Sequence, residues 1–119
     1  MRVLIVDNKQ RARQSMNALL RAWYPAAQLH EAANGMEAVT LAEEYQPDLV
    51  LMDVRMPKMD GLEACRVIKA AQPKIKIIIL SMYPEYEAEA LASGAEAFVS
   101  KSDPPDRLRK MLADVLPRI

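Results

Sequence analysis

The chain has 119 residues, 51% of them hydrophobic, and its 16 basic and 16 acidic side chains cancel, which argues against direct nucleic-acid binding because that requires clustered Lys and Arg. A chain of this length usually folds as one domain with a substantial core, so we expect a single domain over residues 1–119. A single cysteine, the lack of a signal peptide and the lack of any apolar run of about 18 residues predict a cytoplasmic protein with no intrachain disulfide and no membrane segment.

The first half of the chain alternates strand and helix signals. Residues 1–6 are an apolar, β-branched run that stops at Asp7, and apolar residues then recur at helical spacing over residues 10–23. Residues 29–32 have the weaker pattern of a second strand. Residues 34–45 begin with an Asn-Gly-Met-Glu capping signature and stop before a proline, which predicts the second helix.

The second half opens with the most informative segment. Residues 49–52 are large and apolar, as in a buried strand of a parallel sheet, and the strand must stop at Asp53 because a proline and an Asp-Gly pair follow. Helical spacing resumes over residues 62–68, and residues 75–80 are the most strand-like stretch of the chain. The segment therefore places a carboxylate at the end of a central strand.

The remaining elements complete the alternation. We expect a helix from Pro84 that ends at Gly94, a short strand over residues 97–99 and a final helix opened by Pro104 and Pro105. Strands that alternate with helices through short loops predict an α/β fold with a parallel sheet covered on both faces. The predicted fold is a flavodoxin-like, doubly wound (βα)5 domain with strand order 2-1-3-4-5.

Four polar side chains stand at the predicted strand ends: Asp7, Asp53, Ser81 and Lys101. The carboxyl ends of parallel strands share one edge of the sheet, so we expect these side chains to converge there. Two neighbouring carboxylates repel each other, and Mg²⁺ with oxygen ligands relieves that repulsion. A carboxylate can also attack phosphorus, and the metal, a lysine and a hydroxyl suit the transferred oxygens, which predicts phosphoryl transfer onto Asp53. The three glycines form no phosphate-binding loop, so ATP is not the expected substrate.

The chain resembles the response-regulator receiver domain, the phosphoacceptor half of bacterial two-component signalling. The resemblance spans the sequence, from LIVDN through MDVRMPKMDG and ILSM to AFVSK. It implies that a sensor histidine kinase or a phosphotransfer protein phosphorylates Asp53, that Asp7 is an acidic metal ligand, and that the main-chain carbonyl of Arg55 also ligates Mg²⁺. It also implies that Lys101 pairs with the phosphoryl group.

The resemblance further implies how the signal would leave the site. Ser81 matches the switch hydroxyl and Phe98 the aromatic residue that turns inward with it, which alters the surface of the last two helices and the last strand. SMYPE and KSDPPDRL are most similar to receivers of the NarL/LuxR class, which normally precede a helix-turn-helix domain. The resemblance thus implies transcription regulation through a DNA-binding domain absent from these residues, a homodimer on phosphorylation, and a signalling module that is not an enzyme.

The sequence departs from the family pattern near the predicted metal. Asn8 stands where the family usually has a second aspartate, so we predict Mg²⁺ binding by Asp7, Asn8, Asp53 and the Arg55 carbonyl, with reduced affinity. Ser102 follows Lys101 where many receivers have a cis proline, so this bond is either trans or strained. Large side chains at Arg55 and Tyr83 suggest slow spontaneous dephosphorylation.

Two other classes of function fit parts of the sequence. A pseudo-receiver that binds partners without phosphorylation is favoured by Asn8. A phosphatase with an aspartyl nucleophile, as in haloacid-dehalogenase-like enzymes, needs a second acid two residues after the nucleophile, where this chain has Arg55.

Several residues also have purely structural interpretations. Asn8 has the character of a cap for the first helix, and Asp60-Gly61 that of a turn and helix start. His30 is expected to be structural or exposed, and Cys65 to pack on a helix face.

Overall fold

The computed structural model of the chain describes residues 1–116. Five parallel strands form one sheet in the order β2-β1-β3-β4-β5. Their bounds are β1 (Arg2–Val6), β2 (Gln28–Ala32), β3 (Leu49–Asp53), β4 (Lys76–Ser81) and β5 (Ala97–Ser100). The predicted fold class and strand order are therefore confirmed, with strand ends that differ from the predicted ones by one residue at most.

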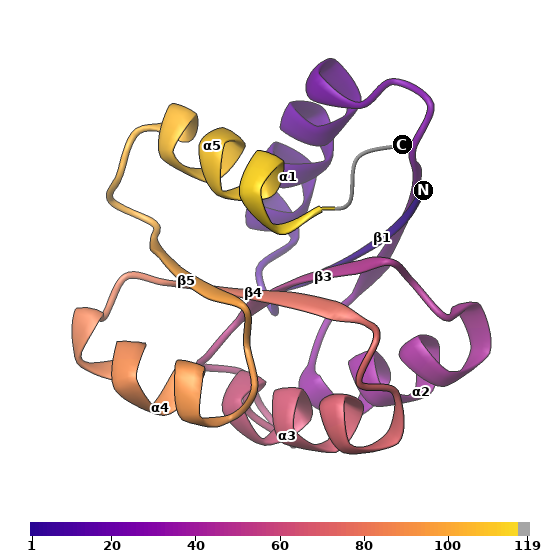
Figure 1. Ribbon diagram of the computed structural model, residues 1–119, viewed down its shortest axis with the longest axis vertical. Helices are drawn as coiled ribbons and strands as arrows, with labels where there is room; N and C mark the ends of the chain where they lie inside the picture. The colour runs from indigo at the N-terminus through magenta and orange to yellow at the C-terminus, as the bar shows by residue number, and fades with distance from the viewer. Residues whose placement is uncertain (117–119) are drawn as a thin grey trace.

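Helices cover both faces of the sheet (Figure 1). On one face lie α1 (Gln10–Trp23) and α5 (Pro105–Val115). On the other lie α2 (Gly35–Tyr45), α3 (Gly61–Ala71) and α4 (Glu87–Ala92). The helix predicted from Pro84 begins instead as a 3₁₀ turn, η1 (Pro84–Tyr86), and becomes α-helical only at Glu87. Short 3₁₀ turns are frequent at helix starts, and sequence periodicity does not reveal them.

The sheet separates two hydrophobic cores. In β1 and β3, Val3, Ile5, Leu49 and Leu51 face the core under α1 and α5. The intervening residues, such as Val50, face the core under α2, α3 and α4. Since side chains alternate along a strand, the position of a residue in its strand decides which face its side chain occupies. This alternation also fixes the faces on which the polar side chains at the strand ends lie.

Helix starts follow the predicted capping pattern in two cases and differ in one. Asn34 and Asp60 are the N-caps of α2 and α3, and each accepts a hydrogen bond, at 2.9 Å, from the main-chain N–H three residues later. The N-cap of α1 is Lys9, without a side-chain hydrogen bond. The interpretation of Asn8 as the cap is therefore wrong, because the helix begins one residue too late for it. Gly94 has the predicted positive φ, at 103°.

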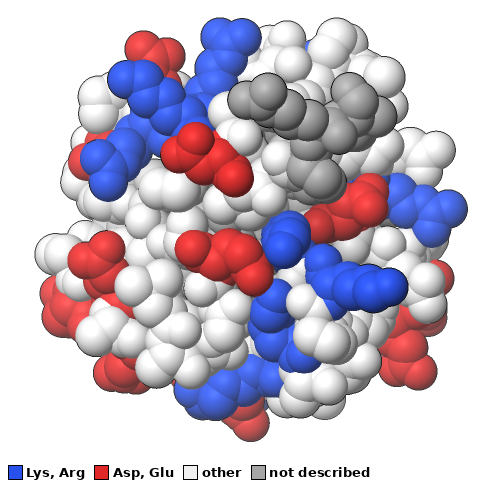
Figure 2. Space-filling view, viewed as in Figure 1, with Lys and Arg blue, Asp and Glu red and all other residues white. Residues whose placement is uncertain are grey.

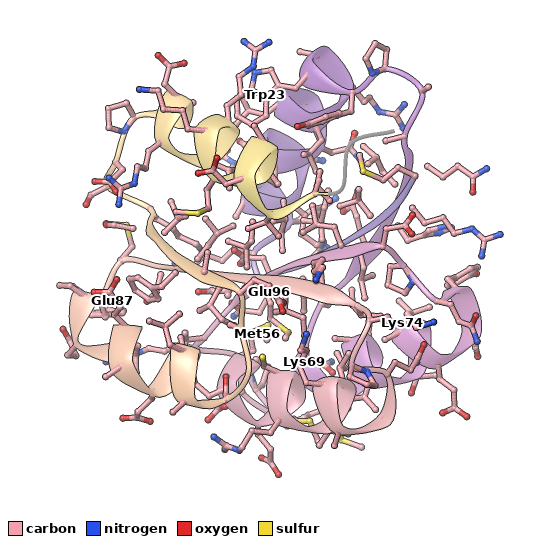
Figure 3. All side chains as sticks on the ribbon, viewed as in Figure 1. Trp23, Met56, Lys69, Lys74, Glu87 and Glu96 are labelled. Atoms are coloured by element: carbon pink, nitrogen blue, oxygen red, sulfur yellow. The ribbon has the colours of Figure 1, made fainter. Side chains whose placement is uncertain are left out.

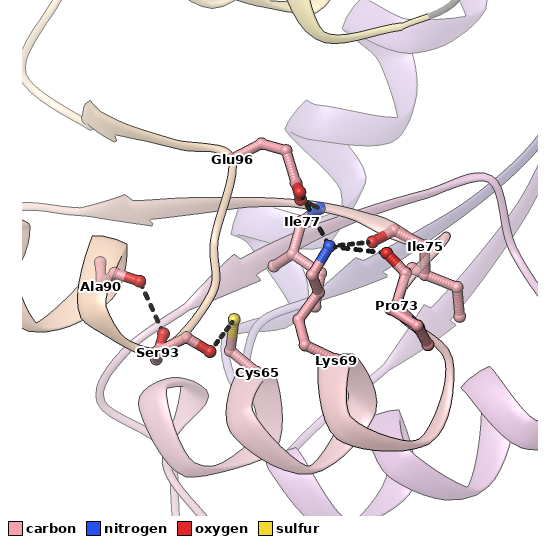
Figure 4. A network of polar contacts seen from close by, with 8 residues as sticks. All are labelled: Cys65, Lys69, Pro73, Ile75, Ile77, Ala90, Ser93 and Glu96. Atoms are coloured by element: carbon pink, nitrogen blue, oxygen red, sulfur yellow. Dashed lines mark hydrogen bonds and ion pairs between the residues drawn. The ribbon is translucent and has the colours of Figure 1, made fainter.

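Lys69 ties the amino ends of β4 and β5 to α3 (Figures 3 and 4). Its ammonium group donates to the carbonyls of Pro73 and Ile75, both at 3.0 Å, and to Glu96 Oε2 at 2.8 Å. The other oxygen of Glu96 accepts from the Ile77 N–H at 2.7 Å. The network stands at the sheet edge opposite the strand ends that carry Asp53 and Ser81, so its role is to support the fold.

Single residues outside that edge take the structural places expected of them. Cys65 is buried on α3, and its thiol donates to the Ser93 carbonyl at 3.6 Å. The His30 ring stacks on Tyr45, with ring centres 4.1 Å apart. Burial also raises the pKa of the Cys65 thiol. Neither residue lies among the polar groups at the carboxyl edge.

Charges of both signs are interspersed on the face shown in Figure 2. The Arg109 guanidinium lies 5.9 Å from the ring centre of Trp23, where α5 approaches the end of α1. No helix within residues 1–116 combines the length and the apolar character needed to cross a membrane.

Candidate functional site

Lys101 joins the two predicted carboxylates at the carboxyl edge of the sheet. Its Nζ lies 2.7 Å from Asp7 Oδ2 and 3.4 Å from Asp53 Oδ2. Each of these residues stands two positions after a strand residue that packs under α1 and α5, so alternation brings all three side chains to that face. The structure therefore joins the side chains of three of the four predicted residues.

The main chain orients both carboxylates. Asp7 Oδ1 accepts a hydrogen bond from the Lys9 N–H, and Asp53 Oδ1 accepts one from the Val54 N–H, each at 2.9 Å. Asp7 is buried, at 5% exposure. In each carboxylate one oxygen is held by backbone and the second faces Lys101. The two acids are thus positioned before any ligand arrives.

Burial sets the acidity of Asp53. Desolvation raises the pKa of its carboxyl above the ordinary value of 3.8, the Lys101 ammonium offsets part of that effect, and the negative charge of Asp7 raises the pKa again. The single ammonium group does not fully compensate two carboxylates. The site therefore favours an additional cation.

The donor set fits Mg²⁺ better than a transition metal. Residues 1–116 contain no cluster of three or more His, Cys, Asp and Glu side chains that would hold a metal ion by themselves. Mg²⁺ needs fewer protein ligands, since it keeps several waters and typically uses one or two carboxylates. Asp7 and Asp53 supply these, and the exposed Asn8 follows Asp7 directly.

Ser81 reaches the same edge but not the same contacts. It ends β4, and it lies on the face of Ile77 and Ile79, which pack toward α2, α3 and α4. Its Oγ accepts a hydrogen bond from the Tyr83 N–H at 3.0 Å. No hydrogen bond within the described residues links Ser81 to Asp53. All four residues thus stand at the predicted edge, and the Lys101 N–H donates to the Ser81 carbonyl at 2.9 Å, but only Asp7, Asp53 and Lys101 are joined by side-chain contacts.

Phe98 is already inside the molecule. Its ring is 8% exposed and belongs to the core under α2, α3 and α4. In this structure an inward turn of the ring, expected on phosphorylation, has therefore already been made. Alternation in β5 places Phe98 on the side of α2, α3 and α4, whereas Val99 faces α1 and α5.

Arg55 contacts two tyrosines, Tyr83 and Tyr86, in the segment after β4. Its guanidinium carbon lies 3.8 Å from the centre of the Tyr83 ring, and its Nε donates to the Tyr86 hydroxyl at 3.2 Å. Sequence reasoning identified Arg55 and Tyr83 as bulky neighbours but missed Tyr86, since nothing in a polar helix start marks a tyrosine as a partner. The bond between Lys101 and Ser102 is trans.

Two further supporting residues were not predicted. A Cβ on Gly61 would lie 1.8 Å from the Asp53 carbonyl oxygen, so only glycine lets α3 begin so close to the end of β3. Arg13 donates from Nη1 to the Asp7 carbonyl at 2.7 Å. The Asp-Gly pair was a sequence signal for the first, whereas the second needed the position of α1.

An apolar cleft adjoins the charged group. It has a volume of about 250 Å³ and runs between α1 and α5, where Met16, Leu19 and Leu108 line it. Asp53 and Lys101 also belong to its lining. The polar edge is therefore bordered by apolar surface on the side of α1 and α5.

Residues 3–113 match the family model for the response regulator receiver domain. The chain belongs to this family. A solved two-component response regulator of the LuxR family from Aurantimonas sp. SI85-9A1 is 30% identical, with a TM-score of 0.86 over 97% of this chain and 86% of that chain. A LuxR-family DNA-binding response regulator from Staphylococcus aureus is 28% identical, with a TM-score of 0.87 over 95% of this chain and 96% of that one.

The curated relatives of this chain differ in total length, so the chain covers different shares of them. The chain is 38% identical to the chemotaxis protein CheY of Thermotoga maritima over 117 residues, which cover 96% of each protein. It is 36% identical to the response regulator protein VraR of Staphylococcus epidermidis over 115 residues, which cover 92% of this chain and 55% of that protein. The chain spans about half the length of most of the curated relatives it matches.

Proposed function

We propose that residues 1–119 act as one receiver domain that accepts a phosphoryl group on Asp53 from a phosphohistidine of a sensor kinase or phosphotransfer protein. The observation that carries this proposal is the Lys101 ammonium held between the carboxylates of Asp7 and Asp53. A buried acid, a nucleophilic acid and a cation at one strand edge are the groups that transfer to a carboxylate requires.

In the proposed reaction, an oxygen of Asp53 forms a bond to phosphorus while the bond from phosphorus to the imidazole nitrogen breaks. The imidazole leaves with the electron pair of that bond and takes up a proton from solvent. Lys101, 3.4 Å from Asp53 Oδ2, is placed to neutralise an added phosphoryl oxygen. The Ser81 hydroxyl would donate to another once it moves from its present partner.

Mg²⁺, when bound, would neutralise charge that develops on the transferred oxygens. Asp7, Asn8, Asp53 and the main-chain carbonyl of Arg55 would hold it. The Lys101 ammonium already contacts Asp7 Oδ2 at 2.7 Å, so Lys101 and the ion would share the negative charge of the two carboxylates. Because Asn8 is neutral, the proposed site carries one negative charge fewer than a site with three acids.

The added charge would shift the population between two packings of the domain. We propose α4, β5 and α5 as the surface that changes, with a homodimer formed on phosphorylation. By analogy with the longer LuxR-family relatives, the output would be transcription regulation through a separate DNA-binding domain, and this domain itself would not contact DNA. The domain changes state and does not turn over a free substrate.

The test is intact mass spectrometry after incubation with acetyl phosphate and Mg²⁺. The native chain should gain the mass of one phosphoryl group, and Asp53→Asn should gain none. Asp114→Asn, which alters an exposed acid on α5, is the control and should react as the native chain does. Phosphorylation of Asp53→Asn to the native extent would contradict the assignment of Asp53.

A pseudo-receiver is the alternative that a specific observation favours, namely the neutral and exposed Asn8 beside Asp7. In that case neither acetyl phosphate nor beryllofluoride with Mg²⁺ would change the mass or the spectra of the native chain. Gain of phosphorylation in Asn8→Asp alone would then show that the second acid is the missing group.

A further inference from the structure

Tyr83 is held from two sides by residues of the candidate site. Its main-chain N–H donates to Ser81 Oγ at 3.0 Å, and its ring stacks against the Arg55 guanidinium at 3.8 Å. Arg55 also binds the Tyr86 hydroxyl, so it spans both ends of η1. Tyr83 therefore connects the hydroxyl of Ser81, at the end of β4, to the loop that follows Asp53.

The hydrogen bond from Tyr83 limits where the Ser81 hydroxyl can go. Ser81 is 1% exposed, so water cannot easily replace a lost partner at its oxygen. If Ser81 turned toward Asp53 while Tyr83 stayed, the Tyr83 N–H would lose its acceptor, at the cost of one hydrogen bond. Movement of Ser81 is therefore coupled to Tyr83, and a shift of the Tyr83 ring disturbs its contact with Arg55.

In this structure a movement of Ser81 cannot be followed by an inward turn of the Phe98 ring. Phe98 is already buried, so its ring has no inward turn left to follow Ser81. Tyr86, by contrast, packs against the same core as Phe98 and is bonded to Arg55. Movement of η1 can thus reach the core under α4 without a change at Phe98.

We propose that Arg55 and Tyr83 form a latch that positions Ser81 in the unmodified domain, and that the signal leaves the site by movement of Tyr83 and η1 while Phe98 stays buried. Arg55 is thus a positioning residue that acts on Ser81 through Tyr83. The release step rests on the proposed phosphorylation of Asp53. The latch itself does not, because its contacts are present in the unmodified chain.

The chemistry of Arg55 explains how the latch would open. A phosphoryl group on Asp53 adds negative charge two residues before Arg55 in the chain. A guanidinium prefers a charged oxygen to the face of a tyrosine ring, because charge-assisted hydrogen bonds are stronger than cation–π contacts at an exposed site. Loss of Arg55 from the Tyr83 ring would free Tyr83 and, with it, the Ser81 hydroxyl.

The first experiment needs no phosphorylation and measures amide hydrogen exchange by NMR in the unmodified protein. Arg55→Met keeps the length of the side chain but removes its charge, and should speed exchange at the Tyr83 and Tyr86 amides about two- to fivefold, the change that matches loss of an exposed cation–π contact. Arg66→Met removes an exposed arginine of α3 and should leave both amides unchanged.

Substitutions of Tyr83 separate the ring contact from a general effect on the loop. Tyr83→Phe keeps the ring and the main-chain N–H, so amide exchange at positions 83 and 86 of this variant should match that of the native protein. Tyr83→Leu removes the ring and should match Arg55→Met. Equal exchange in Tyr83→Phe and Tyr83→Leu, or native exchange in Arg55→Met, would overturn the latch.

The second experiment adds beryllofluoride and Mg²⁺ to protein labelled with ¹³C in the ring of its single phenylalanine, Phe98. We expect the Tyr83 and Tyr86 amide signals to shift while the Phe98 ring keeps its contacts with the buried core. Altered Phe98 contacts with an unmoved Tyr83 signal would overturn the proposed route. If beryllofluoride and acetyl phosphate both fail to react, the proposed function falls, and the exchange experiment still decides the latch.

Discussion

The Lys101 ammonium contacts two carboxylates at different distances. Its ammonium is closer to Asp7, at 2.7 Å, than to Asp53, at 3.4 Å. Asp7 is also the more buried of the two, so the stronger contact goes to the carboxylate that has less access to water. Asp53 keeps an incompletely compensated charge, which is the state in which a carboxylate is most reactive toward an electrophile.

This imbalance predicts a pH-dependent gain in stability for Asp53→Asn in EDTA. The pKa of Asp53 is raised in the folded state, so the folded chain binds a proton more readily than the unfolded chain. The free energy of unfolding therefore falls as pH rises from about 4 through the raised pKa. At pH 7 the native chain carries this loss and Asp53→Asn does not, so the variant should have the higher Tm.

Thermal melts followed by circular dichroism at pH 3, 5 and 7 check this expectation. Near pH 3 position 53 is uncharged in both proteins, so their Tm values should agree. Asp114→Asn alters an exposed acid and should show no such pH-dependent difference. A Tm for Asp53→Asn below that of the native chain at pH 7 would contradict the cause assigned to the raised pKa.

Asn8→Asp tests the proposed metal ligand. One more unit charge at about 4 Å from a divalent ion contributes about 2 kcal/mol even in water, so Mg²⁺ affinity should rise at least on the order of tenfold. Isothermal titration calorimetry measures it directly, and phosphorylation by acetyl phosphate should be faster as well. Unchanged affinity would mean that the side chain at position 8 does not reach the ion.

Arg55 and Tyr83 should also affect the lifetime of the phosphorylated state. Arg55 stands two residues after Asp53 and Tyr83 two residues after Ser81, so their large side chains should hinder a hydrolytic water whether they are stacked or apart, and the Arg55→Ala, Tyr83→Ala double variant should lose its phosphoryl group several-fold faster. The decay of the phosphorylated mass after removal of the donor provides the measurement. An unaltered lifetime would show that these two side chains do not shield the site.

At the scale of elements, the order of strands and the residues at their ends were predictable because each apolar run stops at a polar residue. The face on which Ser81 lies was not. β4 is buried on both faces, so residues 75–80 show no alternation of apolar and polar side chains from which its face could be read. The Ser81 contact with Tyr83 therefore had to come from the structure.

Contacts between loops were equally beyond sequence reasoning. The stack of Arg55 on Tyr83 joins residues 28 positions apart, and no periodic pattern links them. Asn8 shows the opposite error, since its residue type suits a helix cap but the helix starts one residue later. In neither case did local residue preference decide the contact that the residue makes in the folded chain.

Lys69→Met tests the network that holds α3 to β4 and β5. The variant removes three hydrogen bonds and leaves Glu96 without its cation, so it should lower the free energy of unfolding by about 2–3 kcal/mol. Urea unfolding followed by circular dichroism measures this change. The control variant Lys74→Met replaces an exposed lysine just before β4. It should change the free energy of unfolding by less than about 0.5 kcal/mol.

At the scale of the molecule, both cores rest on one sheet and should unfold together. Trp23 packs against the core under α1 and α5, and Cys65 lies in the core under α2, α3 and α4. Trp23 fluorescence and the reactivity of the single thiol toward a disulfide reagent should therefore give the same urea midpoint. Thiol modification well below the fluorescence midpoint would show that the two cores separate.

The assignment of strand-end side chains to opposite faces has a practical consequence for protein engineering. Asp7, Asp53 and Lys101 project toward α1 and α5, whereas Ser81 and Phe98 project toward the other three helices. Substitutions on α1 could therefore alter the surroundings of Asp7, Asp53 and Lys101 without touching the side chains of Ser81 and Phe98. The two sides of the sheet could then be altered one at a time in a domain used as an engineering scaffold.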